Sequence, residues 1–77
     1  MPGRRTGPFR AIGLRLAELR EERGLTQREL AEILELPRSY ISKLETAERR
    51  LDVLDLARLA DAMGITRAEL LQRLLPD

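Results

Sequence analysis

The chain has 77 residues, a formal net charge of +1 at pH 7, 43% hydrophobic residues and only two aromatic ones, so it makes one small domain with an aliphatic core. It holds neither cysteine nor histidine, which excludes disulfides and thiolate zinc sites and removes the usual general base, and we therefore expect neither an enzyme nor a bound metal or cofactor. No apolar run approaches the roughly 20 residues that cross a bilayer, and no signal peptide is recognisable, so a cytoplasmic protein is expected.

The apolar residues are mostly leucine and alanine, which lose little side-chain freedom in a helix, and runs of β-branched residues are nearly absent. An all-α domain is therefore expected over residues 8–77. Residues 1–7 are expected to form a flexible basic tail, because Pro2, Gly3 and Gly7 make a poor helix.

The first helix is predicted over about residues 8–23. Pro8 suits the first helical position, because its missing N–H would be unpaired there anyway. Gly24 can take the left-handed conformation that closes a helix. The apolar residues that recur at helical spacing in this stretch are Phe9, Ile12, Leu16 and Leu19.

The second helix is predicted to begin at Thr26. Thr26 and Glu29 have the spacing of a capping box, in which each side chain bonds the backbone N–H of the other residue. Pro37 interrupts the pattern, since the residue before a proline is pushed away from helical geometry. A third helix is expected from near Pro37 or Arg38, with an apolar stripe of Tyr40, Ile41 and Leu44.

Two more helices are predicted in the C-terminal third of the chain. Asp52 is expected to cap a fourth helix, which Gly64 ends. Thr66 and Glu69 repeat the spacing of a capping box and predict a fifth helix, which Pro76 stops. The core side of the fourth helix is expected to carry Val53, Leu56, Leu59, Ala60 and Met63.

The fifth helix is more apolar than one buried stripe requires. The surplus predicts either a homodimer interface, which we favour, or a helix that simply packs around its own core. The predicted dimer interface consists of Leu54, Leu70, Leu71, Leu74 and Leu75.

Residue types at fixed offsets indicate a helix-turn-helix. Counting from Gln27, Ala31 is fifth, Ile41 fifteenth and Leu44 eighteenth. A small residue at the fifth place lets the two helices approach closely, and the two aliphatic residues clamp the far side of their crossing.

The stretch GLTQRELAEILELPRSYISKLE, followed by ERRLDVLDLARLADAMGITRAELL, resembles the Cro and repressor type of helix-turn-helix protein, the XRE family. The resemblance covers residues 12–75. It implies a compact five-helix, repressor-like DNA-binding domain whose second and third helices form the helix-turn-helix. Members of the family are often transcription regulators that act as dimers, with the third helix in the major groove.

Two positions depart from the family pattern. Glu35 occupies the ninth place of the motif, where the family usually has glycine, and a left-handed backbone there would cost about 1 kcal/mol without glycine. Pro37 replaces the customary Ser or Thr cap of the third helix.

The resemblance implies that Arg38, Ser39 and Lys43 read bases. Arg38 presents a fork suited to the O6 and N7 atoms of guanine, and Lys43 offers a donor to the same acceptors. The alternative for Arg38 and Lys43 is contact with phosphates or solvent only. Tyr40 and Ser42 are candidates for a base or a phosphate, although the Tyr40 ring has a second interpretation as part of the core beside Ile41.

Backbone phosphates are the expected targets of a second set of residues, with a solvated surface as the alternative for each. This set positions the protein on DNA and carries no sequence information. Arg4 and Arg5 could enter a minor groove or belong to an ordinary frayed terminus. The predicted phosphate ligands are Thr26, Gln27, Thr46, Arg49 and Arg50.

Glu45 ends the apolar side of the third helix, where an acid is costly unless it is paired. In the family it commonly pairs with a basic residue of the first helix, and Arg20 stands at the matching place. We therefore expect a structural ion pair between Arg20 and Glu45.

The predicted function is a sequence-specific regulator that binds double-stranded DNA as a homodimer on a palindromic operator. The alternative is an antitoxin or another protein-binding module with secondary DNA binding. Paired carboxylates such as Glu21 and Glu22 point to different helix faces, which disfavours an enzyme. RNA polymerase or another protein is a candidate partner for an acidic patch of Glu29, Glu32 and Glu35.

Overall fold

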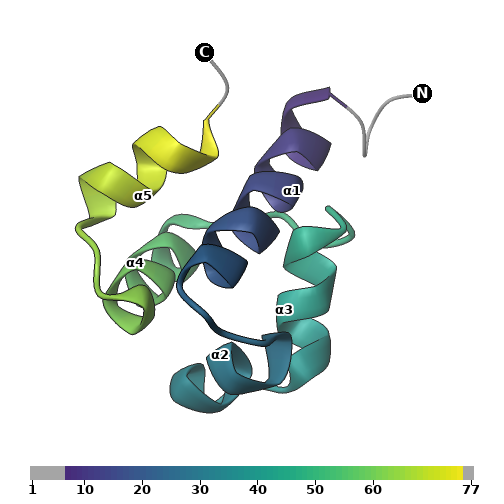
Figure 1. Ribbon diagram of the computed structural model, residues 1–77. Helices are drawn as coiled ribbons and strands as arrows, with labels where there is room; N and C mark the ends of the chain where they lie inside the picture. The colour runs from purple at the N-terminus through teal and green to yellow at the C-terminus, as the bar shows by residue number, and fades with distance from the viewer. Residues whose placement is uncertain (1–6, 76–77) are drawn as a thin grey trace.

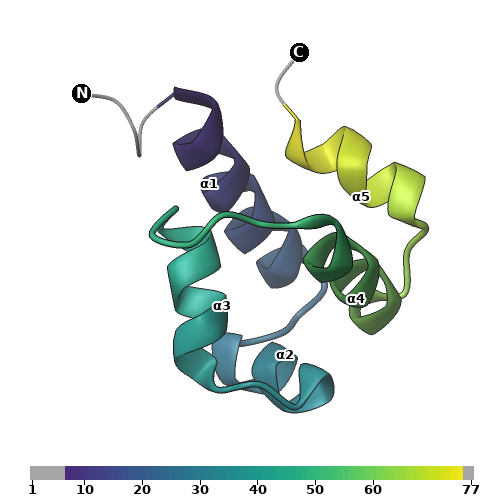
Figure 2. The ribbon, with the colours of Figure 1, turned by 180° about the vertical axis from the view of Figure 1, so that it is seen from behind.

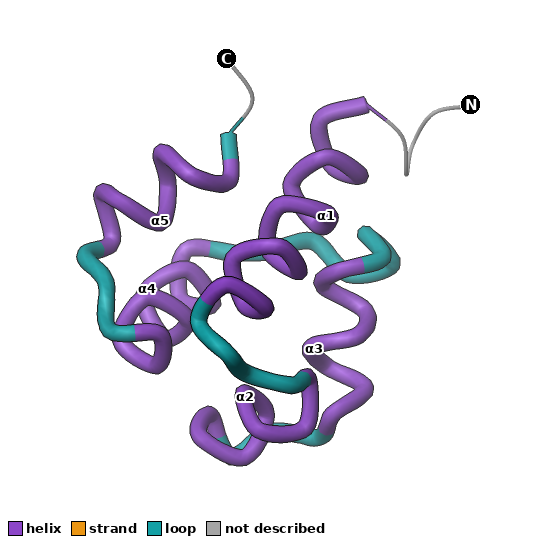
Figure 3. Tube along the Cα trace, viewed as in Figure 1, coloured by secondary structure: helices purple, strands orange, loops and turns teal. Residues whose placement is uncertain are grey.

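The computed structural model describes residues 7–75, and within this range it has five helices and no strand (Figures 1 and 3). This confirms the expected all-α, five-helix domain. Arg4 and Arg5, most of the expected tail and Pro76 lie outside the described residues, whereas Gly7 belongs to the first helix. The helices are α1 (Gly7–Glu22), α2 (Gln27–Leu34), α3 (Arg38–Glu45), α4 (Val53–Met63) and α5 (Arg67–Leu74).

None of the helices among residues 7–75 has the length and apolar character needed to span a bilayer.

The ends of α1 and α2 follow the local sequence signals. Gly24 has a left-handed φ of 75° directly after α1. At the start of α2 the capping box is complete, because the Thr26 N–H donates to Glu29 Oε1 at 2.8 Å and the Glu29 N–H donates to Thr26 Oγ1 at 3.0 Å. These bonds satisfy donors that a helix N-terminus otherwise leaves unpaired.

The ends of α4 and α5 agree with the predictions in part. Gly64 ends α4 with a φ of 72°. Asp52 caps α4 and forms a full capping box with Asp55, a reciprocal pair that the sequence analysis did not include. At α5 the Thr66 hydroxyl accepts from the Glu69 N–H at 3.0 Å, whereas the return bond to the Glu69 carboxylate is not formed.

Helix α1 lies between α3 and α5, and each helix packs against two others. Helix α1 contacts α3 on one side and α5 on the other, while α2 contacts α3 and α4, and α4 contacts α5. Two opposite views place α3 at one side of the molecule and α4 and α5 at the other (Figures 1 and 2), so the outer face of α3 is not covered by them. The buried apolar core is built by Leu16, Leu19, Leu30, Ala31, Ile41, Leu44, Leu59, Ala60, Met63, Leu70 and Leu74.

Val53 corrects one prediction for α4. Its side chain was expected on the core side but is 85% exposed. As the first residue of α4 it precedes the turn that meets the core, and it lines a surface hollow with Leu56 and Leu71 instead. Helical spacing alone predicts that the core side of α4 begins at Val53, one turn before its apolar residues meet the core.

Leu70 and Leu74 correct the predicted dimer interface. They are 0% and 2% exposed and fill the core of their own chain, because the side of α5 that carries them faces α1 and α4. The other three residues of that prediction are on the surface, with Leu54 55%, Leu71 44% and Leu75 45% exposed.

Candidate nucleic-acid interface

Helix α3 separates an apolar side from a polar one. Ile41 and Leu44 are buried against the rest of the helix-turn-helix, with 0% and 4% exposure. The three side chains expected to read bases, Arg38, Ser39 and Lys43, are all exposed. Packing of the apolar side therefore turns the polar side outward.

The turn between α2 and α3 keeps a left-handed residue without glycine. Glu35 has φ 58° and ψ 42°, and its N–H donates to the carbonyl of Glu32 at 3.1 Å. Pro37 precedes α3 with extended backbone and offers no side-chain cap, and its carbonyl accepts from the Tyr40 N–H at 2.9 Å. The turn geometry expected from the motif is thus present, with Glu35 in a conformation that L residues disfavour.

The predicted ion pair between Arg20 and Glu45 is present and buried. Arg20 Nε lies 2.7 Å from Glu45 Oε2, and a second nitrogen donates to Oε1 at 3.2 Å. Both residues are 8% exposed, and Arg20 also donates to the Leu25 carbonyl at 2.7 Å. The bond to Glu45 raises the pKa of Arg20, because it stabilises the charged guanidinium. The pair ties α1 to the last turn of α3.

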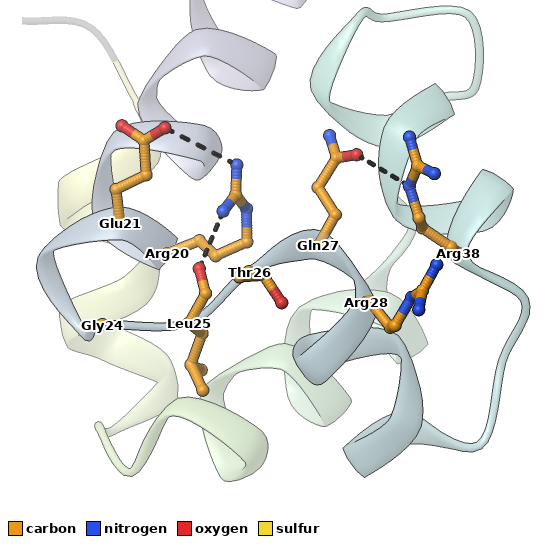
Figure 4. A pocket seen from close by; sticks show the side chains of 8 residues that line it. All are labelled: Arg20, Glu21, Gly24, Leu25, Thr26, Gln27, Arg28 and Arg38. Atoms are coloured by element: carbon orange, nitrogen blue, oxygen red, sulfur yellow. Dashed lines mark hydrogen bonds and ion pairs between the residues drawn. The ribbon is translucent and has the colours of Figure 1, made fainter.

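Gln27 also bonds within the protein. Its side chain is half-buried; Nε2 donates to Glu45 Oε1 at 2.8 Å, and Oε1 accepts from Arg38 Nε at 3.4 Å. Figure 4 shows Gln27 and Arg38 turned toward each other across the start of α2 and α3. The sequence predicts Gln27 as a phosphate ligand and gives no sign of these two bonds.

Tyr40 makes a contact that supports its core interpretation. Its hydroxyl donates to Asp55 Oδ1 at 2.6 Å, and its ring packs against the core beneath the Arg49 guanidinium, which lies 4.3 Å from the ring centroid. The bond to Asp55 raises the pKa of Tyr40, and burial acts in the same direction. The hydroxyl proton of Tyr40 is therefore donated to an acceptor within the protein.

Asp55 is a structural residue that the sequence analysis missed. It is 4% exposed, and its second oxygen accepts from the Asp52 N–H at 3.0 Å. One carboxylate thus completes the cap of α4 and anchors α3 through Tyr40. The spacing of Asp52 and Asp55 was the available signal, because it matches a capping box with aspartate in place of glutamate.

The segment after α3 holds its two arginines against aromatic rings. Arg50 lies 4.6 Å from the centroid of the Phe9 ring, in the same way that Arg49 covers Tyr40. Both arginines are exposed, so stacking restricts them and leaves their charge on the surface. Thr46, expected to bind phosphate, donates to Glu48 Oε2 at 2.9 Å.

Gly13 is a further residue that the sequence analysis did not use. A methyl group added to it would lie 2.9 Å from the carbonyl oxygen of Leu44 and closer still to that of Glu45. Helices α1 and α3 therefore approach each other at this glycine. A glycine in the interior of a predicted helix was the available signal.

Two exposed arginines lie at the start of the helix-turn-helix. Arg28 and Arg38 line an open hollow of about 650 Å³ together with Thr26 and Gln27 (Figure 4). The first N–H groups of α2 have no intrahelical partner, and the helix dipole favours an anion at this end. Two acids are close to this hollow: Glu21 in its lining lies 3.8 Å from Arg20, and the buried Glu45 is paired with Arg20. The surface from this hollow to Lys43 is therefore suited to a polyanion.

The helix-turn-helix family model matches residues 16–70, from within α1 to within α5. An uncharacterized HTH-type transcriptional regulator of Sinorhizobium fredii, y4dJ, is 39% identical over 59 residues, which are 77% of this chain and 77% of that protein. The restriction-modification controller protein C.AhdI from Aeromonas hydrophila is 37% identical, with a TM-score of 0.74 over 80% of this chain and 94% of that one. An XRE-family like protein from Pseudomonas syringae is 40% identical, with a TM-score of 0.76 over 87% and 82% of the two chains.

Some curated relatives are much longer than this chain. Two transcriptional regulators of Mycobacterium tuberculosis are each 39% identical to it, and the chain spans only 11% and 14% of their lengths. In those proteins the similar part is one segment of a larger molecule.

Proposed function

The chain belongs to the XRE family of helix-turn-helix transcriptional regulators, and from that premise we propose that it binds double-stranded DNA sequence-specifically, as a homodimer on a palindromic operator, with α3 in the major groove. One observation carries the proposal. Arg38, Ser39 and Lys43 are exposed on the outer side of α3, while a buried core and the Arg20–Glu45 pair hold its inner side. A rigidly held helix with outward donors is what base reading requires.

The proposed base contacts follow from the donors of these side chains. Arg38 can donate two parallel hydrogen bonds to O6 and N7 of guanine, and Lys43 can donate to the same kind of acceptor. Ser39 can serve several bases or a phosphate. We therefore expect a half-site that contains guanine.

The proposed phosphate contacts flank α3. Thr26 and Gln27 would act at the start of α2, where backbone N–H groups favour an anion, and Thr46 at the end of α3. Arg49 and Arg50 would reach the backbone from their stacked positions. Contacts of this kind set the register of the protein on DNA without reading its sequence.

The proposed dimer uses the apolar surface of α4 and α5. Leu54, Leu71 and Leu75 are about half exposed, and Val53 adds a fully apolar side chain that is 85% exposed. Three of these, all but Leu54, line an apolar hollow of about 200 Å³. Burial of this surface against a second copy would remove it from water and set two recognition helices about 34 Å apart.

Selection from a pool of random duplexes, at two salt concentrations, tests the proposal. The wild type is expected to enrich an inverted repeat, and Arg38→Ala and Lys43→Ala are expected to lose the enrichment. Arg67→Ala on α5 is the matched control, because it removes an exposed arginine away from α3 and should leave the enrichment intact.

Failure of the wild type to enrich any sequence, with weak binding that falls steeply as salt rises, would mean attraction to the phosphate backbone alone. That outcome would overturn the proposal in favour of a protein-binding module.

A further inference from the structure

Arg50 is held over an aromatic ring that belongs to another part of the chain. Arg50 lies in the segment that connects α3 to α4, whereas Phe9 lies near the start of α1. The guanidinium carbon of Arg50 is 4.6 Å from the centroid of the Phe9 ring. Two opposite views show the start of α1 beside the segment that follows α3 (Figures 1 and 2). The contact therefore links α1 with the surface next to the recognition helix.

The ring of Phe9 stands on a helix that the core holds in place. Phe9 is 41% exposed and shares a hollow of about 310 Å³ with Ile12 and the buried Leu44. Ile12 packs against the core, and Leu16, further along α1, is fully buried in it. The position of the ring is therefore set by the packing of α1.

A ring holds an arginine differently from an acid. The attraction acts through the flat face of the guanidinium, whereas its N–H donors point outward in the plane of the group. Glu48, the acid in the same hollow, accepts from Thr46 Oγ1 at 2.9 Å, and the ion pairs among residues 7–75 do not include Arg50. Stacking thus restricts Arg50 without using its donors or neutralising its charge.

We infer that Phe9 is a positioning residue that holds Arg50 ready to bind a DNA phosphate. An arginine that moves freely loses side-chain entropy when it binds, and one that is already restricted loses less. The inference rests on the proposed function, because it assigns how one of the proposed phosphate contacts is prepared. A phosphate contact carries no sequence information, so the effect of Phe9 should be the same on every duplex.

The test measures the Kd of each variant for two duplexes over a series of salt concentrations. One duplex carries the operator selected by the wild type, and the other a random sequence of the same length. Phe9→Leu removes the aromatic face and keeps an apolar side chain of high helix propensity, whereas Phe9→Tyr keeps the aromatic face. Leu14→Ala is the matched control, because Leu14 is also exposed on α1, at 53%, and lines a different hollow with Arg73.

Phe9→Leu is expected to raise the Kd for both duplexes by about 3-fold for each bound copy of the chain, because Arg50 must then be ordered on binding. The slope of log Kd against log salt should stay the same, since the charge of Arg50 is still present. Arg50→Ala should raise the Kd and also reduce this slope by about 1 for each copy. Phe9→Tyr and Leu14→Ala should bind like the wild type.

Two further measurements separate positioning from support of the fold. In an Arg50→Ala background, Phe9→Leu should have no further effect on the Kd, because the side chain that it positions is gone. Without DNA, proton NMR should show the side-chain protons of Arg50 shifted upfield by the ring, and Phe9→Leu should abolish the shift. Thermal unfolding verifies that each variant is folded at the assay temperature.

Three results would overturn the inference. An unchanged or lower Kd in Phe9→Leu would show that the stack does not prepare Arg50 for DNA. An equal rise in Kd in the wild-type and Arg50→Ala backgrounds would assign Phe9 to support of the fold, and an unchanged Kd in Arg50→Ala would remove Arg50 from the interface. Failure of the proposed function is a different result, in which the wild type selects no operator, and the effect of Phe9→Leu can still be measured on the random duplex.

Discussion

Gly13 in α1 lies directly against the backbone carbonyl of Glu45 at the end of α3, with no room for a methyl group between them. A carbonyl at a helix end has little freedom to retreat, and here the Glu45 side chain is also fixed by Arg20. The approach of α1 to α3 therefore depends on the absence of a side chain at position 13.

Gly13→Ala is expected to destabilise the protein by about 1–3 kcal/mol, because the new methyl group overpacks the contact with α3. The sign of the change in unfolding free energy tests the close contact between α1 and α3. Without such a contact, replacing glycine by alanine in the interior of a helix stabilises it by about 1 kcal/mol. Urea unfolding followed by circular dichroism measures the change. A gain in stability would mean that α1 and α3 are farther apart than the structure places them.

Glu35→Gly is expected to stabilise the protein by about 1 kcal/mol and to leave DNA binding unchanged, because glycine adopts the left-handed backbone of the turn without strain. Ala47→Gly should also stabilise the protein, because Ala47 has a left-handed φ of 65°. Glu32→Gly in the helical part of α2 is the control and should lose about 1 kcal/mol. Thermal unfolding measures all three, and a lower melting temperature for Glu35→Gly would contradict the turn geometry.

Removal of one partner of the Arg20–Glu45 pair is expected to cost about 3–5 kcal/mol, because it leaves the other charge buried and unpaired. Glu45→Gln is the variant, and urea unfolding is the measurement. The control is Arg73→Met, which breaks a pair of the same 2.7 Å length between Arg73 and Glu22 on the surface. The loss of that exposed pair should cost much less than the loss of the buried one, because solvent screens its charges. Equal costs for the two variants would mean that burial does not distinguish the pairs.

Tyr40 is expected to ionise above its ordinary pKa of about 10, because ionisation would break its bond to Asp55 and place two negative charges together. The sequence has one tyrosine and no tryptophan, so the ultraviolet absorbance of the phenolate reports this residue alone. Asp55→Asn should bring the midpoint back toward about 10. A midpoint in the wild type equal to that of the urea-unfolded protein would refute the contact.

The raised pKa of Tyr40 also predicts a pH dependence of stability. Below about pH 10 the tyrosine is protonated in both states, and the contribution of its bond to Asp55 is complete. As the pH rises further, the unfolded chain loses the proton first, so stability falls until the folded pKa has been passed. Tyr40→Phe should lack this decline in unfolding experiments across the alkaline range.

Leu71→Glu is expected to weaken the proposed homodimer, because it places a charge in the apolar surface of α4 and α5. Analytical ultracentrifugation over a range of concentrations should show a shift toward monomer. Ile33→Glu is the control, since Ile33 is 52% exposed, like Leu71 at 44%, but lies on α2. Equal dimerisation of the wild type and Leu71→Glu would remove this surface from the interface.

Much of the fold could be predicted because its signals are local. The pairing of Thr26 with Glu29 and the left-handed Gly24 and Gly64 involve residues within a few positions of one another. The Arg20–Glu45 pair spans 25 residues and came from the family resemblance, which supplied the packing of α1 on α3 that the local pattern lacks.

The sequence by itself therefore determined the five helices, the caps at Thr26, Asp52, Gly24 and Gly64, the helix-turn-helix and the side of α3 that faces outward. Only the tertiary structure decided that Val53 is exposed, that Leu70 and Leu74 are buried, and that Tyr40 and Gln27 bond within the protein. The physical reason is that a cap is satisfied by atoms of its own turn, whereas burial and side-chain partners depend on where a distant helix crosses. Gly13 sets one such crossing, and no local pattern gives the position of the carbonyl that it meets.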